Sequence, residues 1–243
     1  MLFRSLDDGR VYTWGTNSIG QLGDGGRDAQ LSPVQVAGLS GIVAVAAGNS
    51  HALALNAAGR VWAWGANASG QLGDGRYKAS RVPVATPFVE VARIRAGGDQ
   101  SAAISRRRAL YLWGENGDGQ LGLGTGVDAG VPVAALQGVV EAATADRFTL
   151  ALGSDGLARG TGANETGSLG DGGSTARNTF GAVSTLSDAI SVSAGGRSFS
   201  GAVTSSGATF MWGDNAAKQL GNTAITSGST ATPTAVPNFD AIP

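Results

Sequence analysis

Few residues of this chain have the types and the spacing that catalysis or metal binding requires. His51 is the only histidine, and there is no cysteine. Nucleophilic triads and histidine metal sites need more partners, so we expect His51 to make a structural hydrogen bond. Segment 122–126 (Gly-Leu-Gly-Thr-Gly) is similar to a phosphate loop but lacks the Lys-Ser/Thr that should follow. Segment 115–119 (Glu-Asn-Gly-Asp-Gly) lacks the closing glutamate of a calcium loop. We therefore expect no catalytic residue, no metal and no cofactor.

Carboxylates that recur by repeat are also weak candidates for catalysis. Asp24, Asp74 and Asp171 each follow a Leu-Gly pair, and Leu123 and Asn222 stand at the same place elsewhere. Short polar side chains at such places are typical of turns. A propeller enzyme acting on glycans would need paired carboxylates facing a central channel, and no acidic pair outside the repeats stands out. We therefore expect the chain not to be an enzyme.

Composition restricts the classes of partner. The chain has 17 basic and 18 acidic residues, so its formal net charge of −1 does not favour a general electrostatic grip on nucleic acid or anionic lipid. No apolar run is long enough to span a bilayer. Residues 1–6 are followed at once by Asp7-Asp8 and lack the pattern of a signal peptide. We expect a soluble protein whose compartment stays open.

The chain is built from internal repeats, which are best sought before single motifs. Residues 9–23 (Gly-Arg-Val-Tyr-Thr-Trp-Gly-Thr-Asn-Ser-Ile-Gly-Gln-Leu-Gly) recur almost unchanged about fifty residues later, over 59–73. Weaker copies follow from about residues 109, 156 and 207. A second block, Val43-Ala-Val-Ala-Ala-Gly-Asn-Ser-His-Ala-Leu-Ala-Leu55, has partners over 91–104, 142–152 and 191–203. A recurring proline precedes a short apolar stretch at Pro33, Pro83, Pro132 and Pro233.

Each repeat is predicted to form four short strands. Segments 43–47, 51–55 and 60–64 are the first three strands of one repeat, and a fourth strand, such as 34–37, follows the proline. Proline at the start of that strand suits a sheet edge, where a missing N–H is tolerated. No segment keeps a period of 3.6 residues, so we expect no helices.

The motif Trp-Gly-x-Asn-x-x-Gly-Gln-Leu-Gly, together with the Ala-Ala-Gly-x-x-His-Ala-Leu-Ala-Leu block, resembles the repeat of the RCC1 (regulator of chromosome condensation) family. The resemblance implies an all-β, RCC1-like β-propeller of four-stranded blades, here with five repeats of about fifty residues. Members of the family are typically seven-bladed. They act as guanine-nucleotide exchange factors, light receptors, ubiquitin-ligase modules or bacterial inhibitor proteins, so the fold does not fix the function.

The blade count leaves two alternatives. The chain opens at the second strand of a repeat, over residues 2–6, and ends at 239–243, where a first strand would begin. It is expected to be an incomplete propeller, a fragment that forms an open arc, and the alternative is a five-bladed ring. We expect a single domain over residues 1–243. Its repeats are predicted at 1–41, 42–89, 90–138, 139–187 and 188–243.

Residues that recur in nearly every repeat are expected to build the fold. The tryptophans at one such position are expected to be packing elements, since large aromatics dominate core energetics. They are Trp14, Trp64, Trp113 and Trp212. The asparagines at another position are expected to bond the loop backbone. They are Asn17, Asn67, Asn116, Asn164 and Asn215. Thr161 replaces the tryptophan in repeat four, which predicts a weaker blade with local repacking or a void.

Residues of the loops that do not recur are free to specify a partner. The turns between first and second strands contribute Asn49, Asp99, Gln100, Asp146, Arg147 and Arg197. The long loops between third and fourth strands contribute Tyr77 and Lys78, with Arg177 in repeat four. The turn on the opposite face of repeat three carries Arg106, Arg107 and Arg108, which is either a solvated turn or a site for phosphate or an acidic partner.

These observations favour a protein-interaction scaffold whose partner docks on one face through such loops. Mixed charges and a tyrosine suit a protein partner better than nucleic acid or membrane. Self-association is a further expectation if the propeller is an open arc. By family resemblance, the alternative is a guanine-nucleotide exchange or regulatory module for a small GTPase.

Overall fold

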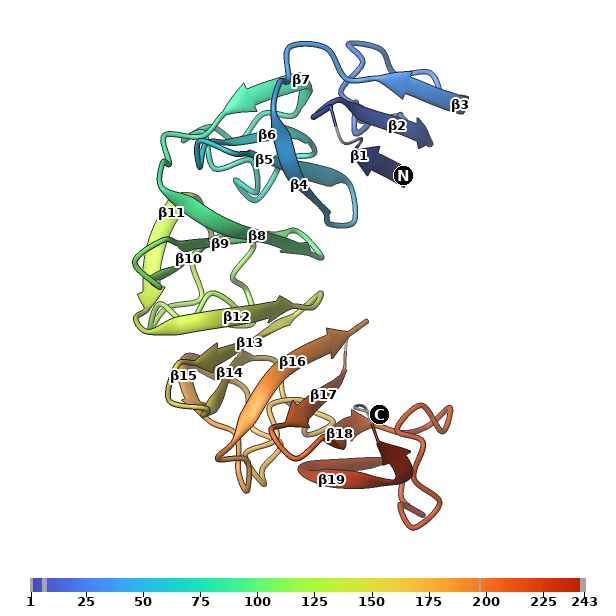
Figure 1. Ribbon diagram of the computed structural model, residues 1–243, viewed down its shortest axis with the longest axis vertical. Helices are drawn as coiled ribbons and strands as arrows, with labels where there is room; N and C mark the ends of the chain where they lie inside the picture. Colours follow the sequence, from blue (N-terminus) through green and yellow to red (C-terminus); the bar gives the residue numbers. More distant parts are fainter. Residues whose placement is uncertain (1, 6–7, 197, 241–243) are drawn as a thin grey trace. The chain divides into compact units, whose positions relative to one another are not determined.

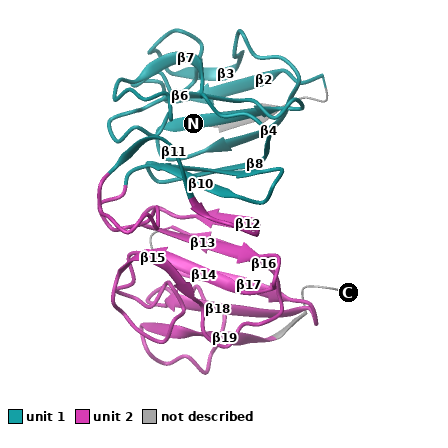
Figure 2. Cartoon of the chain, turned by 90° about the vertical axis from the view of Figure 1, so that its left-hand side faces the viewer, with its two compact units in different colours: residues 1–115, 128–134 teal, residues 116–127, 135–243 magenta. Residues whose placement is uncertain are grey.

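A computed structural model describes residues 2–5, 8–196 and 198–240. Over these residues the chain forms nineteen strands and no helix, as the sequence predicted. The chain divides into two compact units, residues 1–115 with 128–134 and residues 116–127 with 135–243 (Figure 2). We call these unit 1 and unit 2 and describe each by itself. The single domain expected over residues 1–243 stays a prediction.

Unit 1 contains a three-stranded sheet and two four-stranded sheets (Figure 1). The first sheet is β1 (Leu2–Ser5), β2 (Val11–Gly15) and β3 (Gln30–Gln35). The second is β4 (Ile42–Ala47), β5 (His51–Asn56), β6 (Val61–Gly65) and β7 (Ser80–Ala85). The third is β8 (Val91–Gly97), β9 (Gln100–Ser105), β10 (Leu110–Gly114) and β11 (Ala129–Leu136), whose last two residues fall in unit 2.

Unit 2 contains two four-stranded sheets with the same sequential order of strands. The first is β12 (Val139–Thr144), β13 (Phe148–Gly153), β14 (Ala158–Gly162) and β15 (Arg177–Ala182). The second is β16 (Ala189–Gly195), β17 (Phe199–Thr204), β18 (Ala208–Asp214) and β19 (Ser229–Asp240). Each repeat is therefore an antiparallel meander whose strands follow one another in the chain.

Two predicted strand boundaries are wrong. The fourth strands begin before the recurring proline, so Pro33 lies inside β3. The register of the β2–β3 ladder shifts between Thr13 and Gly15. Pro33 lies opposite this irregular part, where a backbone N–H is not needed for the ladder, so a proline is tolerated there. At the other end of the described residues, no new strand begins at Phe239 or Asp240. Strand β19 continues there and pairs Asp240 with Ala208 of β18.

The first sheet lacks the strand that precedes β1 in the repeat pattern, as predicted, over the residues that the structure describes. Whether the sheets close into a five-bladed ring or form an incomplete propeller stays a prediction.

Successive sheets within a unit bury one face against the next. In unit 1, Leu53, Leu55 and Ala63 of one sheet form a cluster with Ile94 and Trp113 of the following sheet. In unit 2, a corresponding cluster joins leucines of β13 to Val192 and Trp212 of the following sheet. Since side chains alternate along a strand, two successive sheets within a unit meet through one face of each.

The recurring tryptophans fix these sheet-to-sheet contacts, as predicted. In three of the four, the indole N–H donates to a backbone carbonyl in the Gln-Leu-Gly or Ser-Leu-Gly segment of the preceding sheet. The bonds are Trp64 to Gln21 at 2.9 Å, Trp113 to Gln71 at 2.9 Å and Trp212 to Ser168 at 2.8 Å. All three side chains are buried. Trp14 is half-buried, and no hydrogen bond to its indole is present among the described residues.

Repeat four shows the local repacking that Thr161 predicted. Thr161 Oγ1 donates to the carbonyl of Gly119 at 2.8 Å, one residue before Gln120, which stands at the position that accepts the indole N–H in other repeats. Phe180 of β15 stands at the position of the recurring proline, and its ring lies 2.6 Å from a Cβ built at Gly122. The equivalent glycines, Gly73 and Gly170, face Trp113 and Trp212 in the same way. An aromatic ring from another strand thus fills the place of the missing tryptophan.

The recurring asparagines hold the loops between third and fourth strands, as predicted. Asn164 is buried, and its Oδ1 accepts the N–H of Leu169 at 2.9 Å. Its Nδ2 donates to Asp171 Oδ1 and to two backbone carbonyls. Asn67 makes the same set of bonds in repeat two, where Asp74 accepts. The recurring aspartates therefore cap loops, which agrees with the structural role expected for them.

Candidate interaction surface

Non-repeating residues gather at one end of each sheet. Strands alternate in direction, so the turn between the first and second strands leaves at the same end as the long loop between the third and fourth. We call this the loop end of a sheet. The turn between the second and third strands leaves at the opposite end.

The turn residues predicted to contact a partner differ in accessibility. Asn49 is exposed in the β4–β5 turn, whereas Asp99 and Asp146 are half-buried in the corresponding turns. Gln100 is fully buried in β9, so its assignment to an exposed turn is wrong. Its pairing with Gly114 makes it the counterpart of His51, which pairs with Gly65. Arg197 lies outside the described residues.

The loop between β6 and β7 presents Tyr77 and Lys78 to solvent at the loop end, as expected. Tyr77 is 57% exposed. The carbonyl of Lys78 accepts a hydrogen bond from Asn67, so the loop backbone is held while the side chain stays outside. Together these two residues offer one aromatic and one basic group.

The turn between β9 and β10 carries the three arginines at the opposite end of its sheet, and all three are exposed. Arg106 donates to the carbonyl of Ala57 at 3.1 Å, and Arg107 lies 3.7 Å from Glu90. Arg108 has a φ of 61°, the conformation that glycine takes in other repeats. Two of the three guanidinium groups therefore have partners within the chain, which favours the solvated turn over a phosphate site.

Arg147 is the centre of a charged cluster in unit 2. Its guanidinium donates to both carboxylate oxygens of Asp118, at 2.7 and 2.8 Å, and to Glu165 at 2.9 Å. The hydrogen bond to Asp118 raises the pKa of Arg147 above its ordinary value. The three residues come from three different loops, two of repeat four and one of repeat three. The sequence identified Arg147 but not its partners, because their separations of 29 and 18 residues show no local pattern.

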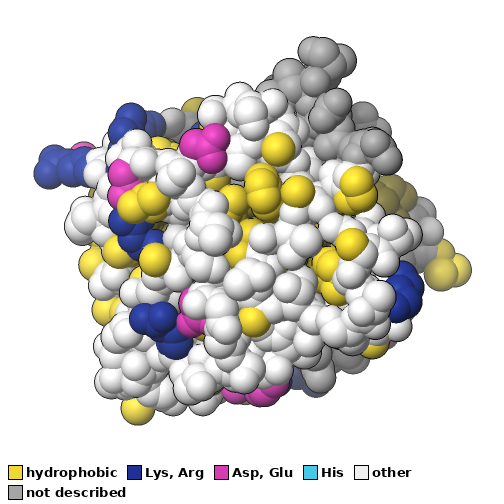
Figure 3. All heavy atoms as spheres, turned by 90° about the horizontal axis from the view of Figure 1, so that it is seen from below, with side chains coloured by type: hydrophobic (Ala, Val, Ile, Leu, Met, Phe, Trp, Pro, Cys, Tyr) yellow, Lys and Arg dark blue, Asp and Glu magenta, His cyan; other side chains and the backbone are white. Residues whose placement is uncertain are grey.

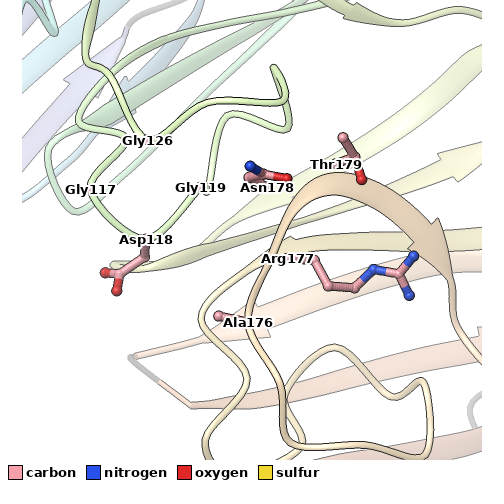
Figure 4. A pocket seen from close by; sticks show the side chains of 8 residues that line it. All are labelled: Gly117, Asp118, Gly119, Gly126, Ala176, Arg177, Asn178 and Thr179. Atoms are coloured by element: carbon pink, nitrogen blue, oxygen red, sulfur yellow. The ribbon is translucent and has the colours of Figure 1, made fainter.

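A cleft of about 500 Å³ adjoins this cluster and is lined by residues of two segments of unit 2 (Figure 4). One segment is the β10–β11 loop with Gly117, Asp118, Gly119 and Gly126, and the other is the start of β15 with residues 176–179. Backbone and side-chain bonds between Asn178 and Gly124 hold the segments together. Arg177 is held by Asp171 at 3.3 Å.

His51 and Ser101 form a buried hydrogen-bonded pair that cannot act as base and nucleophile. Ser101 Oγ donates its only proton to the carbonyl of Gln71 at 2.8 Å. His51 Nε2, 2.8 Å from Ser101 Oγ, must therefore be the donor N–H. Both residues are fully buried, and burial lowers the pKa of His51 to about 4. Counterpart contacts in unit 2, such as Ser200 to Ser168, show that this is an architectural bond.

Among the described residues, no group of three or more His, Cys, Asp or Glu side chains is placed to hold a metal ion. The same residues include no helix that could cross a membrane.

The profile of the RCC1-like domain family matches residues 2–242, nearly the whole chain. The chain belongs to the RCC1-like domain family. The resemblance inferred from the repeats is thereby confirmed, and so is the all-β propeller-type fold of its sheets.

Solved structures agree with this assignment. Prp20p from Saccharomyces cerevisiae, studied with its binding to Gsp1p and histones, is 25% identical with a TM-score of 0.84. Human WBSCR16 is 24% identical, also with a TM-score of 0.84. These matches cover 97% and 96% of this RCC1-like domain, but only 61% and 64% of the chains compared. The domain therefore spans about three fifths of their length.

A curated relative matches a stretch about as long as one repeat. The human E3 ubiquitin-protein ligase HERC2 is 52% identical over 50 residues, which are 20% of this chain and 1% of HERC2. A short stretch of the RCC1-like domain is thus similar to part of a much larger protein.

Proposed function

We infer that this RCC1-like domain is a protein-interaction module, and that its partner docks on the loop end of unit 2. The docking surface consists of the Arg147 cluster and the adjoining cleft, and we call it the cluster-and-cleft surface. The observation that carries the proposal is the cluster itself. In the cluster, hydrogen bonds connect residues of three loops that do not recur in the repeats, and these side chains are accessible to solvent. The recurring residues, in contrast, are mostly buried.

The charges of the surface indicate the chemistry of the partner. Within the cluster, Asp118 and Glu165 carry two negative charges against the one positive charge of Arg147, while the charge of Arg177 in the cleft is balanced by Asp171. Carboxylate oxygens have several acceptor sites, so both groups can accept further donors while they hold Arg147. Glu165 is 62% exposed. We therefore expect a polypeptide segment with a basic side chain, and no preference for nucleic acid.

Selection from a phage-displayed library of random peptides tests the proposal. Peptides enriched on the domain should be rich in Lys or Arg. They should lose at least tenfold in affinity with Glu165→Lys, which reverses the charge, or Ala176→Arg, which fills the exposed cleft wall. Arg60→Ala, an exposed change at the opposite end of a sheet in unit 1, is the control. Unchanged binding to both cluster-and-cleft variants would contradict the proposal.

Guanine-nucleotide exchange is a second candidate, favoured by the similarity to Prp20p. Release of a fluorescent guanine nucleotide from purified Gsp1p, with and without the domain, tests it directly. Acceleration that is unaffected by Glu165→Lys would favour exchange over docking at the cluster-and-cleft surface.

A further inference from the structure

The β6–β7 loop of repeat two places an aromatic side chain over the fourth strand of the following sheet. The ring of Tyr77 lies against Gly130 of β11, and its Cζ is 3.1 Å from a Cβ built at that glycine. Both residues belong to unit 1. The other repeats have no tyrosine at this position, so the contact is not part of the packing that all repeats share. It shows which kind of side chain the groove beside a fourth strand can receive.

Gly126 stands at the position of Tyr77 in repeat three. The recurring asparagine of repeat two donates to the two carbonyls on either side of Tyr77, and that of repeat three donates to the two on either side of Gly126. Two residues earlier, Gly75 and Gly124 have φ values of 77° and 78°, and each donates its N–H to the fourth strand of the next sheet. The two loops therefore follow the same path, and repeat three lacks the ring.

The cleft of about 500 Å³ in unit 2 lies where this ring is missing (Figure 4). Its lining includes Gly126 and Asn178, the counterparts of Tyr77 and Gly130. Its volume is within the range of pockets that bind ligands. The loop wall is rich in glycine, so a flat ring can lie against its backbone. Because Asn178 has a Cβ that Gly130 lacks, the ring must lie a few tenths of an ångström farther from the strand than Tyr77 does.

Asp118 connects the cleft to the Arg147 cluster. It lines the cleft, and both of its carboxylate oxygens accept hydrogen bonds from Arg147. A peptide that places a ring in the cleft therefore brings its neighbouring residues close to the carboxylates of Asp118 and Glu165. A basic residue next to the aromatic residue can then donate to these acceptors.

We propose that the cleft receives an aromatic side chain of the partner polypeptide, next to a basic residue that binds Asp118 and Glu165. The ring takes the place that Tyr77 has in repeat two. This inference rests on the proposed function and deepens it, because it names a second element of recognition. Apolar side chains also gather on the face of unit 2 that Figure 3 shows, but the described residues provide no model of an occupant there, as Tyr77 does for the cleft.

The probe is the synthetic peptide Gly-Arg-Tyr-Lys-Ala-Ser, the sequence of residues 75–80, which carries a tyrosine between two basic residues. A second peptide has alanine in place of the tyrosine. Both are titrated into the domain and followed by the NMR signals of the amides of Gly117, Gly119 and Gly126. The tyrosine peptide should shift these signals and bind at least fivefold more tightly than the alanine peptide, because only its ring is buried in the cleft.

Two matched variants locate the site. Gly126→Tyr supplies the ring from the loop itself, as in repeat two, and should weaken binding of the tyrosine peptide at least tenfold. This variant should fold, because Gly126 has no positive φ and the nearest atom to a Cβ built there is 3.6 Å away. Ser174→Tyr is the control, since Ser174 is exposed and stands at the same position in repeat four. It should leave the affinities of both peptides unchanged.

Three results would overturn the inference. The first is the absence of saturable shifts with the tyrosine peptide, or equal affinities of the two peptides. The second is an equal effect of the two tyrosine variants. The third is a concentration-dependent dimer in sedimentation velocity that Tyr77→Ala abolishes, because Tyr77 of a second copy would then occupy the cleft.

Glu165→Lys separates this inference from the proposed function. It should weaken both peptides to the same degree and leave the preference for tyrosine intact. Weaker binding of both peptides without any preference for tyrosine would support the proposed function and overturn the inference. A preference for tyrosine that Glu165→Lys leaves unchanged, at unchanged affinities, would support the aromatic site and contradict docking of a basic residue.

Discussion

The ring of Phe180 lies over Gly122, at the place where a tryptophan lies over the equivalent glycine of other repeats. The two residues are far apart in sequence. Gly122 lies in the β10–β11 loop of one sheet, and Phe180 lies in strand β15 of the next. Repeat four has therefore exchanged an aromatic side chain on its third strand for one on its fourth. The aromatic contact between neighbouring repeats is kept, but the side chain that makes it comes from a different strand.

Phe180→Ala should destabilise unit 2 by about 2–4 kcal/mol, because it removes the ring that replaces the indole. Thr161→Trp alone should also destabilise, by about 1–3 kcal/mol, since two rings would compete for one place. The double variant Thr161→Trp/Phe180→Pro restores the pattern of the other repeats. Chemical denaturation should find it more stable than the sum of the single changes predicts. Strict additivity would show that the two positions do not share a site.

Alanine scanning of glycines should separate crowding from backbone strain. Gly119 and Gly124 have φ values of 80° and 78°, so alanine costs both about 1–2 kcal/mol of left-handed strain. A Cβ at Gly119 would also lie 2.7 Å from Asn178 Cα, whereas nothing lies within 4 Å of one at Gly124. Thermal unfolding should place Gly119→Ala clearly below Gly124→Ala. Equal melting temperatures would contradict the close approach.

Stability should fall between pH 6.5 and pH 4 through His51. Burial lowers its pKa from 6.5 to about 4, so in this window the unfolded chain binds a proton that the folded chain excludes. The contribution is fully present above pH 6.5 and decreases by about 3 kcal/mol as the pH falls to 4. His51→Gln, which copies the buried Gln100 of the next repeat, should reduce this slope. An identical pH dependence of unfolding in both proteins would refute the assignment.

Asn164→Ala should destabilise the loop after β14 by about 2–3 kcal/mol, because it leaves the buried N–H of Leu169 without its acceptor. Asn178→Ala is the control, since Asn178 is exposed and its side chain makes one bond, to Gly124. Hydrogen exchange of the Leu169 amide should accelerate in the first variant only. Protection unchanged by Asn164→Ala would contradict its role in the loop.

The candidate surfaces were only partly accessible to sequence reasoning. Arg147 was found because it interrupts the repeat pattern. Asp118 and Glu165 were missed, because they occupy ordinary loop positions of the repeat. Their closeness to Arg147 depends on how neighbouring sheets stack. Gln100 was misplaced because a turn and the start of a strand look alike in a Gly-Asp-Gln-Ser segment.

By itself, the sequence determined the all-β repeats, the absence of helices over the described residues, and the structural roles of the tryptophans and asparagines. It could do so because each repeat solves the same local packing problem, and recurrence marks the residues that solve it. Only the tertiary structure decided that Phe180 replaces a tryptophan and that Arg147 meets Asp118 and Glu165. Both depend on distances between side chains of successive sheets, and these are set by stacking, which no single repeat encodes.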